Sequence, residues 1–416
     1  MDPITSLAEW LTSLMSGWGW PAGVVSLIVT FLGVFLIANF GMLYVIFLIW
    51  LERKLAARLQ DRLGPNRVGP YGLLQTFADI LKLFTKEDTT PAGADKLIFN
   101  MAPILSVLSV LMIWAVVPFA ENWLGAPINV AVLYIVAVGS IGIVATLIGG
   151  WSSNNKFALL GAFRTVAQLV SYEVPMVLSL LVPVLLAHDM SLNSIVQAQG
   201  NWFSIFFWMA PIAALIFFIS SIAEVGRTPF DLLEAESEIV AGFHIEYSGA
   251  KFAMIFAAEF LHAFTISALT ITLFFGGWQG WGDKFPIVAW VWFMLKAMTA
   301  YFVVVWVRST LPRIRIDHML SYNWKFLTPV SLAVLIVTAL LDKILLGTEA
   351  VPGLINMETA GGQLMRTLTM FVANLIIAWV TVVILRRQWA QRPERTKVSQ
   401  PRPVARPPKP ETTTTA

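Results

Sequence analysis

Six carboxylates crowd a short stretch between two long apolar runs of this sequence. Residues 221–249 read SIAEVGRTPFDLLEAESEIVAGFHIEYSG, and Arg227 is the only strong base among them. Clustered carboxylates repel one another, so we expect some of them to have raised pKa values and to exchange protons near neutral pH. The stretch therefore predicts proton-transfer chemistry, with a simple solvated acidic loop as the alternative. The six acids are Glu224, Asp231, Glu234, Glu236, Glu238 and Glu246.

The same loop carries residues that a uniformly solvated acidic segment would not need. Thr228-Pro229 and Gly242 are turn signals, and Phe230 and Phe243 are large apolar side chains. This combination favours a structured, partly buried and functional loop.

Further charged residues interrupt the apolar runs themselves. A charge at the bilayer centre costs at least about 2.5–3.5 kcal/mol, so such groups usually face a protein interior, a water-filled cavity or one another. Several acids suit a proton path better than a set of static ion pairs, although an ion pair stays open for any one of them. His262 follows Glu259 by three residues and shares its helix face; it is either a proton partner or a satisfied interior histidine. The intramembrane charges are Arg164, Glu173, Glu259 and Lys296.

Other chemistries are excluded by what the sequence lacks. With no cysteine, this chain has no disulfide, no catalytic thiolate and no cysteine-ligated iron–sulfur cluster. No two of its four histidines have the HExxH spacing, and neither GxxxxGK[ST] nor GxGxxG occurs. A redox or nucleotide-driven function would therefore need cofactors on another chain.

Composition identifies the elements that must hold these acids. The 416 residues are 57% hydrophobic and only 13% charged, with a mean hydropathy of +0.73, whereas soluble domains are about a quarter charged. Apolar runs of about 20 residues, the length that crosses a roughly 30 Å hydrocarbon core, recur along the chain. The sequence predicts an all-α polytopic membrane protein. Its candidate spans lie near 23–51, 98–118, 129–149, 158–187, 203–223, 252–275, 286–307, 327–346 and 364–385.

Basic residues predict the orientation of these spans. Of the 28 lysines and arginines, 24 fall in alternate connections or the C-terminal tail, and the first 22 residues contain none. By the positive-inside rule, the N-terminus lies outside and both the acidic loop and the C-terminus are cytoplasmic. The first run has no basic n-region and no cleavage site, so we interpret it as a span and not as a signal peptide.

Residues 52–97 form a cytoplasmic segment that is too long for a simple turn. Apolar residues between Leu73 and Phe84 have helical spacing, which predicts an amphipathic helix in the membrane interface or, alternatively, one packed on a partner protein. Before it, Gly64, Pro65, Gly69 and Pro70 predict fixed turns. Residues 386–416 are rich in Pro, Arg and Thr, which predicts a disordered tail.

Four stretches carry a resemblance to a known family. They are ERKLAARLQDRLGPNRVGPYGLLQTFADILKLFTKE, GAFRTVAQLVSYEVP, AEVGRTPFDLLEAESEIVAGFHIEYSG and RSTLPRIRIDHML. In this order they closely resemble the signature stretches of the H subunit of NADH-quinone oxidoreductase, respiratory complex I, from about residue 22 to 346.

The resemblance implies an eight-helix core where the peripheral arm meets the membrane arm, with residues 364–385 as an additional ninth span. A quinone, ubiquinone or menaquinone, would pass from the bilayer between the first helix, the interfacial helix and the sixth helix. FMN and iron–sulfur clusters would lie on partner subunits, and this chain would have no stand-alone activity. Quinone reduction would protonate a chain of buried carboxylates that leads to antiporter-like subunits.

The resemblance also assigns roles to individual residues. The quinone entrance and cavity would include Arg53, Arg62, Arg67, Asp79 and Phe230. The coupling loop would comprise Glu224, Arg227, Asp231, Glu234, Glu236 and Glu246. Glu173 and Glu259 would continue the proton path, Lys296 would balance its charge, and Arg313 and Arg315 would dock the peripheral arm. His262 matches no motif of the family.

The expected organisation has four parts: a periplasmic segment 1–22, the quinone-chamber core 23–346 with its loops 52–97 and 224–251, an extra loop and ninth helix 347–385, and a cytoplasmic tail 386–416. The expected partners are the other subunits of the complex, quinone and membrane lipid, without nucleic acid or metal. Two alternatives remain, the membrane subunit of a related energy-converting hydrogenase and a secondary transporter. The absence of an internal repeat disfavours the transporter.

Overall fold

The computed structural model describes residues 3–232, 240–348, 351–352 and 360–390. Within these ranges, eight helical segments are long and apolar enough to cross a membrane. This confirms the predicted all-α polytopic membrane fold. The segments are α2 (Ala22–Leu59), α4 (Lys96–Trp114), α5 (Ala131–Ser152), α6 (Lys156–Ala187), α11 (Gly249–Phe274), α12 (Pro286–Thr310), the continuous run α13 (Ile316–Tyr322), η4 (Asn323–Leu327) and α14 (Thr328–Leu346), and α15 (Ala360–Ala390).

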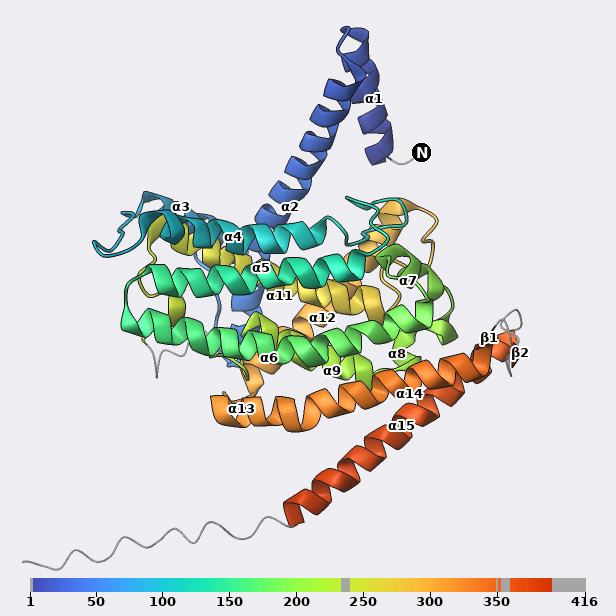
Figure 1. Cartoon of the computed structure of the whole chain (residues 1–416). Coiled ribbons are helices and arrows are strands. Elements are labelled where there is room, and N and C mark those ends of the chain that lie inside the picture. Colours follow the sequence, from blue (N-terminus) through green and yellow to red (C-terminus); the bar gives the residue numbers. More distant parts are fainter. Residues whose placement is uncertain (1–2, 233–239, 349–350, 353–359, 391–416) are drawn as a thin grey trace, which may run out of the picture.

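Most of these helices lie side by side in one bundle (Figure 1). Helix α4 packs on α5, α5 on α6, and α6 on α14, while α11 packs on both α4 and α12. Helix α2 crosses the bundle at a steep angle and contacts α11 and α12 (Figure 1). Small residues allow close approach between helices: a Cβ at Gly150 in α5 would lie only 2.4 Å from the Ala162 side chain of α6.

The fifth predicted span is broken, so the prediction of one continuous helix over 203–223 was wrong. The structure has η2 (Trp202–Ser204), α8 (Phe206–Met209) and the short helix α9 (Pro211–Val225). Pro211 lacks a backbone N–H and restricts the residue before it, so α9 begins at this proline. At the other end Gly226 takes a left-handed conformation with φ of 69° and ends α9 directly after Glu224–Val225.

The predicted amphipathic helix is present as α3 (Gln75–Thr85), which packs on α2 and α11. Its approach is a tight turn that includes η1 (Pro70–Gly72). Gly72 has φ of +76°, and a Cβ there would lie 2.2 Å from the carbonyl oxygen of Pro65, so the turn requires glycine. Two further short helices, α7 (Leu192–Ala198) and η3 (Gly242–His244), lie in connections.

The N-terminal segment contains a helix that was not predicted from the sequence. Helix α1 (Pro3–Gly17) folds back along α2 (Figure 1). Its 15 residues are shorter than a typical membrane span, and this is why a search for long apolar runs passes over it.

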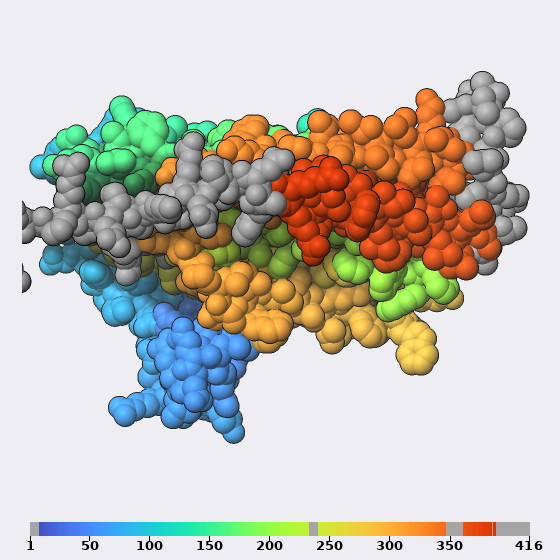
Figure 2. Space-filling model, turned by 90° about the horizontal axis from the view of Figure 1, so that it is seen from below, coloured from blue at the N-terminus to red at the C-terminus, as the bar shows by residue number. Residues whose placement is uncertain are grey.

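The ninth predicted span is α15, which begins and ends a few residues outside the predicted 364–385. Residues 386–390 were expected in the disordered tail but form its last turn, while 391–416 lie outside the described residues. A pair of two-residue strands, β1 (Gly347–Thr348) and β2 (Val351–Pro352), pairs antiparallel between α14 and α15, with Gly347 opposite Pro352. Figure 2 shows α15, in red, lying along α14, in orange.

A buried ion pair holds α15 to the bundle. Arg366 of α15 donates from Nε (3.0 Å) and Nη2 (2.5 Å) to Oδ1 of Asp342 in α14, and from Nη2 to the carbonyl of Leu186 (3.1 Å). Both side chains are at least nine-tenths buried. Thr367 and Asn374 add hydrogen bonds to the carbonyls of Phe203 and Met209. The ninth helix is therefore fixed by polar contacts at several positions along its length.

We expect Arg366→Leu to destabilise the protein by about 3–5 kcal/mol, because it removes the buried guanidinium and leaves the Asp342 carboxylate with only the exposed His188 beside it. The midpoint of thermal unfolding of the detergent-solubilised complex measures the effect. Replacing Asp342 and Arg366 together by leucine should recover most of the loss. Arg387→Leu on the exposed end of α15 is the matched control. An equal midpoint for the Arg366 and Arg387 variants would contradict the anchoring role.

Candidate functional site

The Glu52 cluster, which comprises Glu52, Arg227, Tyr301 and Arg308, joins three separate elements at the heart of the molecule. Glu52 lies near the end of α2, Arg227 directly after α9, and Tyr301 and Arg308 on α12. The Tyr301 hydroxyl donates to Oε2 of Glu52 at 2.9 Å. Arg308 forms a close ion pair with the same carboxylate, and Arg227 approaches it to 3.8 Å. The Arg227 guanidinium also lies 4.6 Å from the ring centroid of Phe260 in α11.

The sequence alone assigned no role to Glu52, Tyr301 or Arg308. Glu52 is 5% exposed and Tyr301 is fully buried, whereas the Arg308 side chain is one-third exposed, so the cluster extends from the interior to the surface. One signal was available, because Glu52 follows the apolar run of α2 directly and precedes Arg53. The pairing could not be predicted from the sequence alone, because the partners are 175 residues or more away from Glu52 in the chain.

Three adjoining cavities lead inward from this cluster, and we name each by one lining residue. The Arg227 cavity, of about 10 Å³, is lined also by Asp231, Glu259 and Arg308. The Glu259 cavity, of about 70 Å³, is lined by Glu259, Glu224 and His262 together with three hydroxyl residues of α4 and α5, Ser106, Ser109 and Thr146. The Glu173 cavity, of about 20 Å³, is lined by Glu173, Glu224 and His262. A water needs about 10–15 Å³, so the Glu259 cavity has room for several waters.

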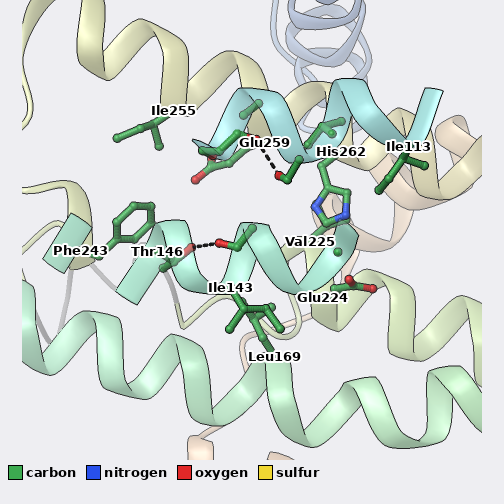
Figure 3. Close-up of a pocket in the computed structure, with 16 residues that line it drawn as sticks. Ile113, Ile143, Thr146, Leu169, Glu224, Val225, Phe243, Ile255, Glu259 and His262 are labelled. Carbon is green, nitrogen blue, oxygen red and sulfur yellow. Dashed lines mark hydrogen bonds between the residues drawn. The ribbon is translucent and has the colours of Figure 1, made fainter. Parts of the chain in front are cut away.

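The acids that line these cavities come from different helices. Glu173 lies on α6, Glu224 on α9 and Glu259 on α11. Figure 3 shows Glu259 and His262 extending from α11, with the His262 ring directed toward Glu224. Oε1 of Glu173 lies 3.4 Å from the Ser140 hydroxyl of α5. The fold thus brings five predicted residues into one connected group: Glu173, Glu224, Arg227, Asp231 and Glu259.

Four residues predicted for the quinone entrance lie on the α2–α3 side. Arg53 of α2 contacts Asp79 of α3 at 2.5 Å, a charge-assisted hydrogen bond that joins the two helices. Arg62 and Arg67 are exposed on the turn between them, and Arg62 donates to Gln60. Helix α3 also carries exposed apolar side chains such as those of residues 77 and 81.

The other predicted site residues lie apart from the cavities. Phe230 is buried against Tyr172, with 5.3 Å between ring centroids. Glu246 accepts from the Asn155 amide at 2.6 Å. Lys296 donates from Nζ to the carbonyls of Phe275 (3.0 Å), Gly277 (3.2 Å) and Gln279 (2.7 Å), just beyond the end of α11. The predictions for Glu234, Glu236 and Glu238 fall outside the described residues.

Aromatic side chains anchor the C-terminal part of the predicted loop. Tyr247 stacks on Phe99 of α4 with 4.1 Å between ring centroids, and its hydroxyl donates to the Phe99 carbonyl. His244 of η3 contacts the rings of Phe243 and Phe252. Burial among these rings lowers the pKa of His244 to about 4. The imidazole is therefore neutral at physiological pH.

These features define a class: a polytopic helical membrane protein whose interior acids line small cavities that begin at a buried arginine–carboxylate cluster. Among residues 3–232, 240–348, 351–352 and 360–390, no group of three or more histidines, aspartates and glutamates could hold a metal ion.

Comparison with known proteins identifies the family. The sequence profile of the NADH dehydrogenase family matches residues 32–339. A protein of Dehalococcoides mccartyi (strain CBDB1), named as the H subunit of NADH-quinone oxidoreductase, is 47% identical over 309 residues, which cover 74% of this chain and 85% of the relative. Its namesake in Geobacillus sp. (strain WCH70) is 46% identical over 319 residues, 76% of this chain and 95% of the relative. The chain belongs to the family of NADH-quinone oxidoreductase H subunits.

We expect acid to destabilise the protein through His244. Its ordinary pKa of 6.5 is lowered to about 4 by burial, so between these values the unfolded chain binds a proton that the folded chain does not. Stability is fully present above pH 6.5 and falls by up to about 3 kcal/mol as the pH drops toward 4. Unfolding of the solubilised complex at pH 6.5 and 4.5 measures the loss, which His244→Phe should reduce. The exposed His318→Phe is the control, and the same acid sensitivity in wild type and His244→Phe would contradict the assignment.

Proposed function

We propose that this chain is the membrane-arm subunit of a proton-pumping NADH:quinone oxidoreductase that forms the quinone chamber at the junction with the peripheral arm and couples quinone reduction to proton translocation. Membership of the H-subunit family supports the assignment of this chain to that complex. The observation that carries the coupling role is the run of adjoining cavities from Arg227 to Glu173, lined by acids of three helices.

The quinone enters from the bilayer between α2, α3 and α11. Support comes from the apolar side chains on the exposed side of α3 and from the mutual packing of these three helices. The Arg53–Asp79 pair fixes α3 on α2, so it keeps the rim of this entrance in place. Inward of the rim, Nη2 of Arg227 is buried and has no hydrogen-bond partner among the described residues. This donor suits a carbonyl oxygen of a quinone, because an unsatisfied buried donor is costly.

Reduction of a quinone to a quinol takes two electrons and two protons. The electrons come from an iron–sulfur cluster on a partner subunit, and the FMN of the complex lies on another partner. The change of charge beside Arg227 alters the electrostatic potential at Asp231 and Glu259, which line the same cavity. Proton exchange then continues through Glu224 to Glu173 and on to the antiporter-like subunits.

The remaining predicted residues keep proposed roles around this path. Lys296 fixes the end of α11 through its three carbonyl contacts, and so positions the helix that carries Glu259. Phe230 supports the loop by packing on α6. Arg62 and Arg67 stand at the outer part of the entrance, and Glu234, Glu236 and Glu246 belong to the coupling loop. The proposed location is the plasma membrane, with the N-terminus outside and the C-terminus cytoplasmic.

We expect Glu224→Gln to lower NADH:quinone reduction and proton pumping by roughly tenfold or more, because an amide cannot exchange the proton that this carboxyl carries. NADH oxidation by ferricyanide, which needs no quinone chamber, should stay unchanged. Both rates are measured in membrane vesicles that hold the assembled complex. Glu121→Gln, in an exposed connection, is the matched control. Equal loss of both activities would indicate failed assembly, and full pumping would contradict the proposal.

Asp79→Leu should raise the apparent KM for quinone by roughly tenfold, equivalent to ~1.4 kcal/mol, and leave kcat nearly unchanged. The reason is that Arg53 loses its charged partner and α3 is no longer fixed at the entrance. Steady-state kinetics with a short-chain quinone in vesicles measures both constants. Lys86→Leu, at the exposed end of the same helix, provides the comparison. An unchanged KM would remove Asp79 from the entrance.

A further inference from the structure

His262 lies where two of the cavities meet. The Glu259 cavity and the Glu173 cavity share four lining residues, Ile113, Gly139, Glu224 and His262. Of these, Ile113 is apolar and Gly139 has no side chain. A proton that moves from Glu259 to Glu173 must therefore pass the place where only Glu224 and His262 can bind it.

The histidine ring is directed into this junction. His262 follows Glu259 by three residues on α11, so the two side chains share a helix face. Figure 3 shows the ring extending toward Glu224 across the space between the helices. The described part of the chain provides no hydrogen-bond partner for either ring nitrogen. A histidine that only fills the core would have its nitrogens bonded, so this arrangement points to an exchangeable partner such as water.

The two cavities that His262 lines also contain carboxylates and hydroxyls. Glu259 comes from the same helix as His262, Glu224 from α9 and Glu173 from α6. Helices α4 and α5 contribute the hydroxyls of Ser109 and Thr146 to the same cavity. Among the described residues no lysine or arginine lines the Glu259 or Glu173 cavity. A protonated imidazole at this place would therefore be balanced by an ionised carboxylate.

We propose that His262 is a proton relay between Glu259 and Glu173, working with Glu224 at the junction of the two cavities. This inference rests on the proposed function of the chain. A neutral imidazole accepts at one ring nitrogen and donates at the other, so it can take up a proton on one side and release a different one on the other side.

The transfer balances without any electron change. A proton leaves the Glu259 carboxyl group, crosses water in the Glu259 cavity and bonds to the free ring nitrogen. The N–H bond at the second nitrogen then breaks, and this proton goes to the Glu224 carboxylate or to water in the Glu173 cavity. The ring ends neutral as the other tautomer, and rotation of the ring restores the first arrangement.

The test compares His262→Gln and His262→Asn with wild type in membrane vesicles that hold the assembled complex. Neither amide can take up a proton near neutral pH. We expect proton pumping and NADH:quinone reduction to fall by at least about tenfold, and the pH–rate profile to lose the limb that the histidine contributes. Ferricyanide reduction reports assembly and should be unchanged. His318→Gln, at an exposed histidine of α13, is the matched control, and Glu224→Gln is the reference for the carboxylate path.

Each result separates the relay from the proposed function. The relay would be overturned if both His262 variants kept wild-type pumping and a wild-type pH profile while Glu224→Gln was impaired. The proposed function would then still stand. Normal pumping in Glu224→Gln as well would overturn the proposed function. The asparagine side chain fits within the space of the imidazole, so loss of assembly in both variants would show that His262 is a packing residue and would also overturn the relay.

Discussion

The Glu52 carboxylate is the contact on which the interior of this protein depends. A carboxylate withdrawn from water costs several kcal/mol unless opposite charges and hydrogen bonds surround it. Here Arg308, Arg227 and the Tyr301 hydroxyl supply them from two other parts of the chain. The same contacts hold α2 against α12 and fix the segment after α9. The position of Arg227, and with it the first of the three cavities, follows from this single cluster.

Farther inside, the acids are placed by helix ends and breaks. Pro211 starts α9 late and Gly226 ends it early, so that Glu224 lies in its last turn at the edge of two cavities. Lys296 binds the carbonyls beyond α11 and so fixes the helix that carries Glu259 and His262. Small side chains between α4 and α5 leave room beside these acids. The proposed proton path needs such space, because water can bridge carboxyl groups that are too far apart for a direct hydrogen bond.

Sequence reasoning predicted the spanning helices well because a 20-residue apolar run has few alternatives. It also singled out Glu173, Glu224 and Glu259, which line the cavities, since a charge in an apolar run is conspicuous. It missed the break at Pro211, where apolar residues continue on both sides of the interruption and hide it. It missed Tyr301 because a tyrosine in a span is unremarkable until its hydroxyl meets Glu52. The role of Glu52 came from tertiary contacts with residues far along the chain, and no local pattern contains that information.

The ninth helix shows the same division between local and tertiary information. Its apolar run predicted α15, but its attachment rests on Arg366 and Asp342, which pair across two helices. Both residues lie beyond the part of the chain that matches the NADH dehydrogenase family profile, which ends at 339. This helix is therefore an addition that is fastened to the family core by its own buried ion pair.

The most direct test of the account is a density map of the assembled complex with quinone bound, at a resolution that shows ordered water. We predict water density in the Glu259 and Glu173 cavities, and a quinone that reaches the Glu52 cluster close enough to accept a hydrogen bond from Arg227. Dry cavities, with the quinone remote from these residues, would contradict the central claim that the interior carboxylates are connected to the quinone chamber.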